Sequence, residues 1–174
     1  TEIKSHAYRA LRRSRLKEMH AVRYADDFKI FCASHEDAVR AYKATELWLK
    51  DRLGLEISPD KSKVVNLKRQ YSDFLGFKLK VRRKGKKYVV RSHMSDKAYK
   101  KAHDKVSEEV KELAHSSDDN VQFMQLQKYN SVVAGLHEYY CISTEVSHDF
   151  SRLAFSINKQ LRNRLKGDLS LSLI

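Results

Sequence analysis

The sequence contains few cysteines and no long apolar segment. Cys32 and Cys141 are its 2 cysteines among 174 residues and lie far apart, so a disulfide framework is not expected and two buried reduced thiols are the simpler interpretation. The 8 histidines show no ligand spacing to either cysteine, which argues against a zinc site. No run of about 18 apolar residues that could span a membrane occurs, and the N-terminal segment has no apolar signal core. These absences predict an intracellular, cytoplasmic protein.

Acidic residues are outnumbered by basic ones. The chain carries 35 Lys and Arg against 22 Asp and Glu, a formal net charge of +13. Such an excess favours a polyanionic partner, and we expect nucleic acid rather than an acidic membrane surface. The length fits one domain or two small ones, and 41% hydrophobic residues are enough to form a core.

The apolar periodicity changes once along the chain. Before residue 95, short β-prone stretches surround one amphipathic helix that begins after Ser34 and ends at Gly54. From residue 95 onward, apolar stripes of helical period cover 95–115, 121–140 and 149–166. We predict an α+β fold, with antiparallel strands and a packed helix in residues 1–94 and three helices in residues 95–174.

Several shorter elements complete this prediction. Residues 1–20 carry six Lys and Arg and are expected to form a basic arm or helix. A hairpin turn is expected at Lys84-Gly85-Lys86. Extended segments are expected at 21–24, 28–33, 55–57, 64–67, 71–81 and 87–91. The aromatic residues of the helices are interpreted as core: Trp48, Phe123, Tyr139, Tyr140 and Phe155.

Two adjacent acids stand between two of the β-prone stretches, in the segment Tyr24-Ala25-Asp26-Asp27. Pairing of the flanking strands would put both carboxylates at the tip of a hairpin, where they repel each other unless cations neutralise them. Hard cations such as Mg²⁺ prefer oxygen ligands and keep positions open for phosphates. The pair therefore fits a phosphoryl-transfer site, and an ordinary solvated turn is the alternative.

Four blocks in fixed order carry a resemblance to a known family. Residues 22–28, then Gly54-Leu55-Glu56-Ile57 leading to Lys61-Ser62, then Phe74-Leu75-Gly76-Phe77 resemble the last three conserved blocks of reverse transcriptases. Residues 135–140, which read Gly-Leu-His-Glu-Tyr-Tyr, are similar to the thumb (maturase, or X) domain of group II intron reverse transcriptases. The resemblance implies that 1–94 form the C-terminal part of a polymerase palm and that 95–174 form the thumb.

The resemblance also implies a metal centre to which this chain contributes only a part. Members of the family bind two Mg²⁺ ions with three main carboxylates, one of which lies on an earlier palm strand. Asp26 matches the principal ligand and Asp27 the supporting one, but neither the third Asp nor the fingers can be found before Lys17. We therefore expect the third Asp and the N-terminal fingers and palm half to come from outside this chain, which alone is expected to be inactive.

Further residues acquire roles from the same resemblance. Tyr24 would lie beside the primer end, with simple strand packing as the alternative. Lys61 matches a basic residue near the triphosphate, where it would protonate or screen the leaving pyrophosphate, and a solvated lysine is the alternative. Phe74, Leu75 and Gly76 resemble the primer grip, although Gly76 could equally mark a bulge in a strand.

Basic residues gather in two places. Between Lys78 and Lys101 there are eleven Lys and Arg and a single acid, Asp96. Alternation along a strand would put Lys78, Lys80 and Arg82 on one face, next to Arg83 and Lys84, where they can follow a phosphate backbone. On the last helix Arg152, Lys159 and Arg162 suggest a second contact with RNA. A charge run of this kind can also be only a solvated face.

Three functions are compatible with these patterns. The first is a portion of a group II intron reverse transcriptase, an RNA-directed DNA polymerase that binds intron or template RNA, a DNA primer and dNTP and contributes two Asp to two-metal nucleotidyl transfer. The second is a non-catalytic, maturase-like RNA-binding fragment that assists RNA splicing. The third is a basic helical module in which the acidic turn is accidental.

Overall fold

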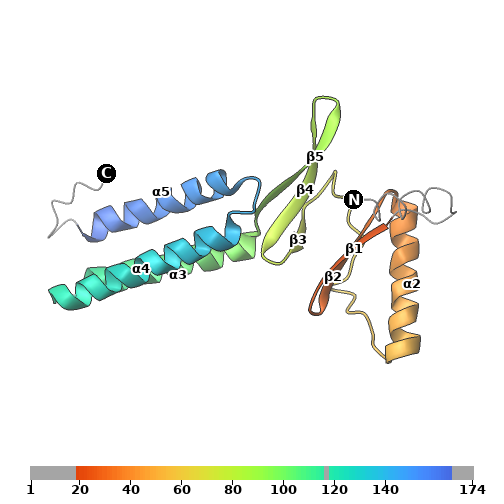
Figure 1. The fold of residues 1–174 in the computed structure, drawn as a ribbon, viewed down its shortest axis with the longest axis horizontal. Coiled ribbons are helices and arrows are strands. Elements are labelled where there is room, and N and C mark those ends of the chain that lie inside the picture. Colours follow the sequence, from red (N-terminus) through yellow and green to blue (C-terminus); the bar gives the residue numbers. More distant parts are fainter. Residues whose placement is uncertain (1–18, 116–117, 166–174) are drawn as a thin grey trace, which may run out of the picture. The chain divides into compact units, whose positions relative to one another are not determined.

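The computed structural model describes residues 19–115 and 118–165 (Figure 1). The predicted basic arm at residues 1–20 lies almost entirely outside the described residues. The chain divides into two compact units, 1–66 and 67–174. None of the described helices is long and apolar enough to cross a membrane.

The first unit begins with an antiparallel hairpin. Strand β1, Met19–Tyr24, pairs with strand β2, Asp27–Cys32, in a register that runs from Met19 opposite Cys32 to Tyr24 opposite Asp27. The predicted hairpin around the two acids is therefore confirmed. The β-prone residues on both sides of a two-residue loop explain why the chain reverses here.

Helix α2, His35–Leu53, follows the hairpin and has the predicted ends. The Ser34 hydroxyl accepts a hydrogen bond from the backbone N–H of Asp37 at 3.2 Å, which satisfies one of the free donors of the first turn. Gly54 ends the helix with φ 62°, a left-handed conformation that glycine adopts without strain.

The first unit buries little of its apolar surface. Among residues 19–66 only Asp37 is buried, and every residue of β1 is exposed. Trp48 on α2 is 56% exposed, so its interpretation as core is wrong within this chain. A two-stranded hairpin is too narrow to cover a helix of 19 residues.

Two predicted extended segments, 55–57 and 64–67, do not form strands. Within the second unit, the N–H of Val81 donates to the carbonyl of Leu67 at 2.8 Å. A single backbone bond does not make a ladder, so Leu67 is not part of a strand.

The second unit contains a three-stranded antiparallel sheet in the order β3-β4-β5. The strands are β3, Ser72–Phe74, β4, Phe77–Lys84, and β5, Lys87–Met94. The hairpin predicted at residues 84–86 is confirmed, because Lys84 pairs with Lys87. The prediction of one extended segment over 71–81 is wrong, since the chain reverses at residues 75–76.

Three helices follow the sheet and lie alongside one another (Figure 1). They are α3, Asp96–His115, α4, Asp119–Tyr140, and α5, Val146–Arg164. Their shared core consists of Val106, Val110, Leu153 and Ile157. The α+β class, the antiparallel strands and the C-terminal helices are thus confirmed.

The predicted boundary at 94/95 coincides with the change from strand to helix, but the compact units divide at 66/67. The sheet stays with the helices because its last residues pack and bond against them. Met94 is buried with Ala102 and Tyr140. The N–H of Ser92 donates to the Thr144 hydroxyl, and the N–H of Thr144 donates to the Ser92 hydroxyl, each at 2.8 Å.

Candidate functional site

The two acids occupy the loop end of the β1–β2 hairpin. Tyr24 and Asp27 form the last pair of the ladder, so Ala25 and Asp26 are the two loop residues. Both carboxylates are exposed, and the Tyr24 side chain is 65% exposed. The hairpin therefore presents an aromatic ring and two carboxylates to solvent together, and packing against the strand does not occupy Tyr24.

The loop is held in a strained backbone conformation. Ala25 has φ 49°, in the left-handed region that favours glycine, where an alanine costs about 1–2 kcal/mol. The Arg23 guanidinium braces the loop, because its Nε donates to the carbonyl of Ala25 at 2.8 Å. Strain that persists in a two-residue loop is a feature found where function constrains geometry.

The donor set at this loop fits part of a magnesium site. Asp26 and Asp27 offer carboxylate oxygens, and Mg²⁺ commonly binds one or two carboxylates and fills its remaining positions with water and substrate phosphates. Within residues 19–115 and 118–165, no third Asp, Glu, His or Cys gathers with them. The described residues thus offer two carboxylates at the positions where the resemblance implies ligands.

Lys61 lies in a tight turn elsewhere in the first unit. Its backbone N–H and that of Ser62 donate to the carbonyl of Ser58, at 3.2 and 2.9 Å. The Lys61 side chain is exposed, and in the described part of the chain no ion pair joins it to Asp26 or Asp27. The structure leaves its ammonium group available to a ligand.

The segment predicted as a primer grip is a hairpin loop and not a bulge. Phe74 pairs with Phe77, and the two residues between them have φ 49° at Leu75 and 78° at Gly76. Positive φ at both central positions is typical of a type I′ turn. The Leu75 carbonyl accepts from the Tyr139 hydroxyl at 3.2 Å, and the Gly76 carbonyl accepts from the N–H of Ser95 at 2.8 Å.

Gly76 is also required by its surroundings. A Cβ at this position would lie 3.1 Å from the hydroxyl oxygen of Tyr140 and 3.8 Å from Cβ of Ala98. The Tyr140 side chain is buried, as predicted, and burial raises the pKa of its hydroxyl, with a smaller contribution from Tyr139. The absence of a side chain at Gly76 therefore lets the loop lie directly against the end of α4.

The basic residues of β4 differ in their availability. Alternation puts Lys78, Lys80 and Arg82 on one face of the strand. Lys78 Nζ is 2.6 Å from the Asp96 carboxylate, and this hydrogen-bonded ion pair lowers the pKa of Asp96. Lys80 Nζ lies 5.1 Å from the centre of the Tyr71 ring.

The basic residues near the tip of the β4–β5 hairpin, Arg82, Arg83 and Lys84, are exposed. Arg83 uses its Nε to brace that turn, donating to the carbonyl of Gly85 at 3.0 Å. The Lys78 ammonium group, by contrast, already forms an ion pair with Asp96. The tip therefore presents more exposed positive charge than the base of the strand.

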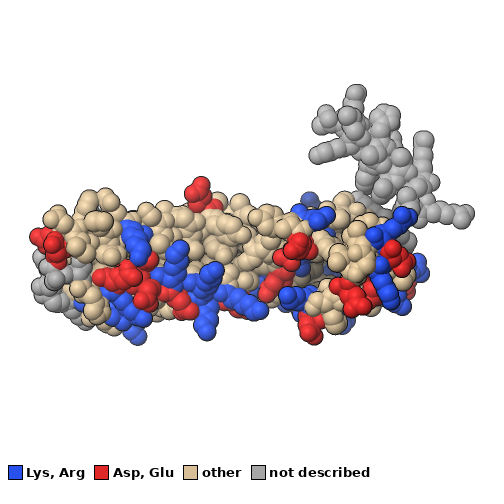
Figure 2. Space-filling model, turned by 90° about the horizontal axis from the view of Figure 1, so that it is seen from below, with Lys and Arg blue, Asp and Glu red and all other residues tan. Residues whose placement is uncertain are grey.

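Helix α5 presents a mixed basic and aromatic face. Arg152, Lys159 and Arg162 are exposed, and helical spacing places Phe155 among them. Phe155 is 78% exposed, so its interpretation as core is wrong, as it is for Phe123, which is 61% exposed. Figure 2 views the molecule from below, the side on which α3 and α4 lie in Figure 1, and on that face Lys and Arg side chains stand among Asp and Glu.

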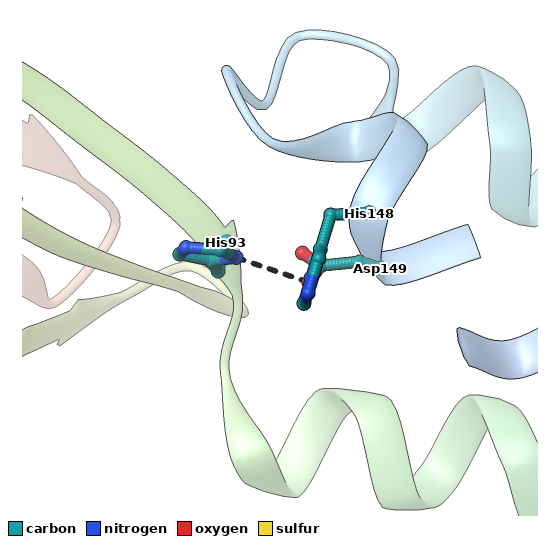
Figure 3. A group of neighbouring side chains, drawn as sticks. All are labelled: His93, His148 and Asp149. Atoms are coloured by element: carbon teal, nitrogen blue, oxygen red, sulfur yellow. Dashed lines mark hydrogen bonds and ion pairs between the residues drawn. The ribbon is translucent and has the colours of Figure 1, made fainter. Parts of the chain in front are cut away.

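One cluster of side chains that could bind a metal ion has no signal in the sequence. His93, His148 and Asp149 come from two elements and lie together in the second unit (Figure 3). His93 and Asp149 are 56 positions apart, so no local spacing marks them. Histidine spacing to the cysteines, which led us to expect no zinc site, does not bear on a cluster that contains no cysteine.

Comparison with known proteins supports one part of the resemblance. Residues 3–79 match the family model of reverse transcriptase (RNA-dependent DNA polymerase). The matched range contains the acidic loop, Lys61 and the Phe74–Phe77 turn, and it leaves residues 135–140 outside. A search of curated proteins found no match to this chain. The match supports a likeness of residues 3–79 to a segment of a reverse transcriptase.

Proposed function

We propose that this chain is a portion of a group II intron reverse transcriptase and maturase that acts in the cytoplasm. As part of a larger RNA-directed DNA polymerase, it would bind intron or template RNA, a DNA primer and dNTP. The observation that carries the proposal is the exposed Tyr24-Ala25-Asp26-Asp27 loop at the tip of a hairpin inside the reverse transcriptase match. On this proposal residues 1–94 are the C-terminal part of the palm and 95–174 are the thumb or X domain.

The proposed metal centre uses the two loop carboxylates. Asp26 and Asp27 would hold Mg²⁺ together with a third Asp from outside this chain. Mg²⁺ held there would supply the Lewis-acid chemistry that activates a primer 3′-hydroxyl and stabilises the leaving phosphates. In this proposal Tyr24 lies beside the primer end and Lys61 screens the charge that develops on the pyrophosphate.

The uncovered surface of the first unit supports the idea that more polymerase structure packs there. Val22, Phe28, Trp48 and Leu53 are each between 44% and 56% exposed. Apolar patches of this kind mark surfaces that another element covers. The two-stranded hairpin also has unpaired edges in the described residues, and a further palm strand would satisfy them.

Reconstitution of DNA synthesis tests the proposal. Primer extension on a primed RNA template with Mg²⁺ is expected to give cDNA when the chain is combined with an upstream fingers and palm half, and none when the chain is supplied alone. The upstream half alone is the control. Absence of synthesis from a combination whose two parts co-purify would contradict the catalytic assignment.

The second candidate function is non-catalytic RNA binding that assists splicing. It is favoured by the exposed face of α5, where Phe155 can stack on a base while Lys159 and Arg162 contact phosphates. This function needs no carboxylates. Binding of intron RNA with unchanged splicing assistance after loss of the acidic loop would select it over the polymerase.

A matched pair of variants tests the α5 face in either case. The double variant Lys159→Gln/Arg162→Gln is expected to weaken binding to single-stranded RNA and to reduce the slope of log K against log salt by about 1.4, since each phosphate contact contributes about 0.7. The measurement is fluorescence anisotropy at several salt concentrations.

The control for this experiment is Lys105→Gln/Lys111→Gln on α3, which removes the same charge from exposed positions next to Asp104 and Glu108. It is expected to leave the slope nearly unchanged. Equal slopes for the two double variants would show that the α5 face makes no specific contact.

A further inference from the structure

His93, His148 and Asp149 bring three metal-ligand groups together where β5 ends and α5 begins (Figure 3). Asp149 Oδ1 is 3.0 Å from His93 Nδ1 and 3.5 Å from His148 Nδ1. One ligand atom from each of the three side chains lies within 4.8 Å of the other two. The two imidazole rings meet edge to face, with centroids 5.8 Å apart.

These separations match the spacing of ligands around a small tetrahedral ion. Zinc binds imidazole nitrogen and carboxylate oxygen at about 2.0–2.1 Å, so neighbouring ligands of a tetrahedral ion lie about 3.3 Å apart. The two separations measured from Asp149 Oδ1 lie on either side of that value. Small rotations of the two rings would therefore suffice to admit the ion.

The surroundings hold the ligands in place. Asp149 is 4% exposed, and its second oxygen accepts the N–H of Met94 at 2.8 Å, which fixes the carboxylate. The His93 ring packs edge to face against Tyr71. The His148 side chain is 60% exposed and gives an ion access from solvent. The fixed Asp149 carboxylate and the accessible His148 ring together allow a metal ion to enter from solvent and bind.

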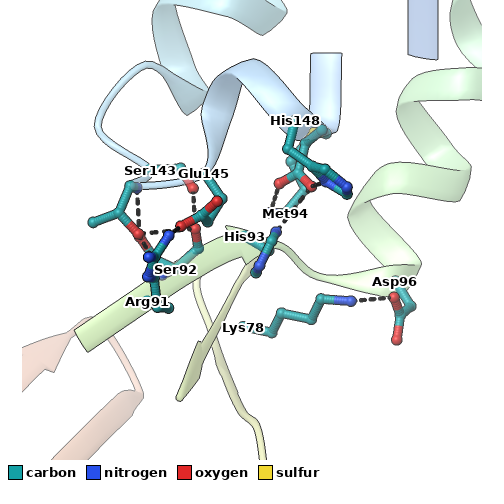
Figure 4. Close-up of polar contacts among 11 residues, drawn as sticks. Lys78, Arg91, Ser92, His93, Met94, Asp96, Ser143, Glu145 and His148 are labelled. Atoms are coloured by element: carbon teal, nitrogen blue, oxygen red, sulfur yellow. Dashed lines mark hydrogen bonds and ion pairs between the residues drawn. The ribbon is translucent and has the colours of Figure 1, made fainter. Parts of the chain in front are cut away.

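Two basic side chains lie near the cluster but interact with other groups. A pocket of about 120 Å³ beside it is also lined by Lys78 and Arg152. Lys78 forms its ion pair with Asp96 at 2.6 Å (Figure 4), and the Arg152 guanidinium lies 4.9 Å from the centre of the Tyr99 ring. The positive charge of each is thus directed to another partner, and the pocket leaves room for a water molecule on the ion.

We propose that His93, His148 and Asp149 bind one Zn²⁺ ion that cross-links β5 to α5. Two imidazoles and one carboxylate suit zinc, whereas magnesium prefers oxygen ligands alone. The site lies in the second unit and is separate from the acidic loop, so it goes beyond the proposed polymerase function. A bridge between strand and helix would stabilise the three-helix part of the chain.

The test is a titration of the full chain with Co²⁺, whose absorption reports tetrahedral coordination, followed by displacement with Zn²⁺. One ion per chain is expected. His148→Gln is expected to weaken binding at least about 100-fold, since even the loss of an outer-shell partner costs 10–100-fold. Because His148 is mostly exposed, circular dichroism is expected to show an unchanged fold.

Two further variants complete the test. Asp149→Asn keeps an oxygen that can accept the N–H of Met94 but removes the charged ligand, and it is expected to lose the tetrahedral absorption. His115→Gln removes an exposed histidine at the end of α3 and is expected to bind like the wild type. Equal affinity in all variants, or no uptake by the wild type, would overturn the proposal.

Discussion

Asp26→Asn is expected to reduce Mg²⁺-dependent cDNA synthesis by the reconstituted polymerase by at least about 100-fold, the size of effect that follows loss of one strong electrostatic stabiliser of a transition state. The substitution preserves shape and removes the charge that would hold the ion. Asp26 is an exposed loop residue at a hairpin tip, so stability should change little. The measurement is the rate of primer extension at saturating template and dNTP.

The control is Asp51→Asn, an exposed acid in the last turn of α2 in the same unit. It removes the same charge from a different element and is expected to extend primers at the wild-type rate. RNA affinity should be unchanged in both variants, because a carboxylate and a phosphate carry like charges and do not attract each other directly. Undiminished synthesis by Asp26→Asn would remove the metal-site assignment.

Gly76→Ala is expected to lower the free energy of unfolding by about 3 kcal/mol. Left-handed φ costs an alanine about 1–2 kcal/mol, and forcing a methyl group into a packed site costs about 1–3 kcal/mol more. Both terms apply, because φ is 78° and the new Cβ would meet the Tyr140 hydroxyl oxygen at 3.1 Å. Urea unfolding followed by circular dichroism measures the loss.

Two further variants separate the backbone cost of the left-handed φ from the packing cost of the new methyl group. Gly85→Ala has φ 62° and no atom within 4 Å of the new Cβ, so it should lose only the backbone term of about 1–2 kcal/mol. Tyr140→Phe should restore part of the stability of Gly76→Ala by removing the hydroxyl. Equal losses at positions 76 and 85 would show that the contact with Tyr140 has no energetic effect.

The same experiment bears on the primer-grip prediction. The carbonyls of Leu75 and Gly76 are both used inside the second unit, by the Tyr139 hydroxyl and the N–H of Ser95. A glycine that is needed for folding does not have to be explained by contact with a primer. A variant such as Gly85→Ala, with similar backbone strain but no clash, is therefore the proper reference for any loss of primer binding.

Local patterns predicted the elements whose causes are local. Ser34 and Gly54 mark the two ends of α2 because capping and left-handed φ depend on the residue at the end itself. The hairpin at the two acids and the three later helices follow from periods of 2 and 3.6 residues. The turn at Leu75-Gly76 was missed, because a leucine with positive φ is rare and Tyr139 helps to hold it there.

Sequence alone therefore determined the α+β class, the order of most elements and the acidic loop that matches reverse transcriptases, since these depend on neighbours a few positions apart. Only the tertiary structure decided what each side chain meets. Phe155 is exposed although its helix is amphipathic, and Lys78 is committed to Asp96 although it belongs to a basic run. His93 meets Asp149 across 56 positions because strand β5 ends where helix α5 begins.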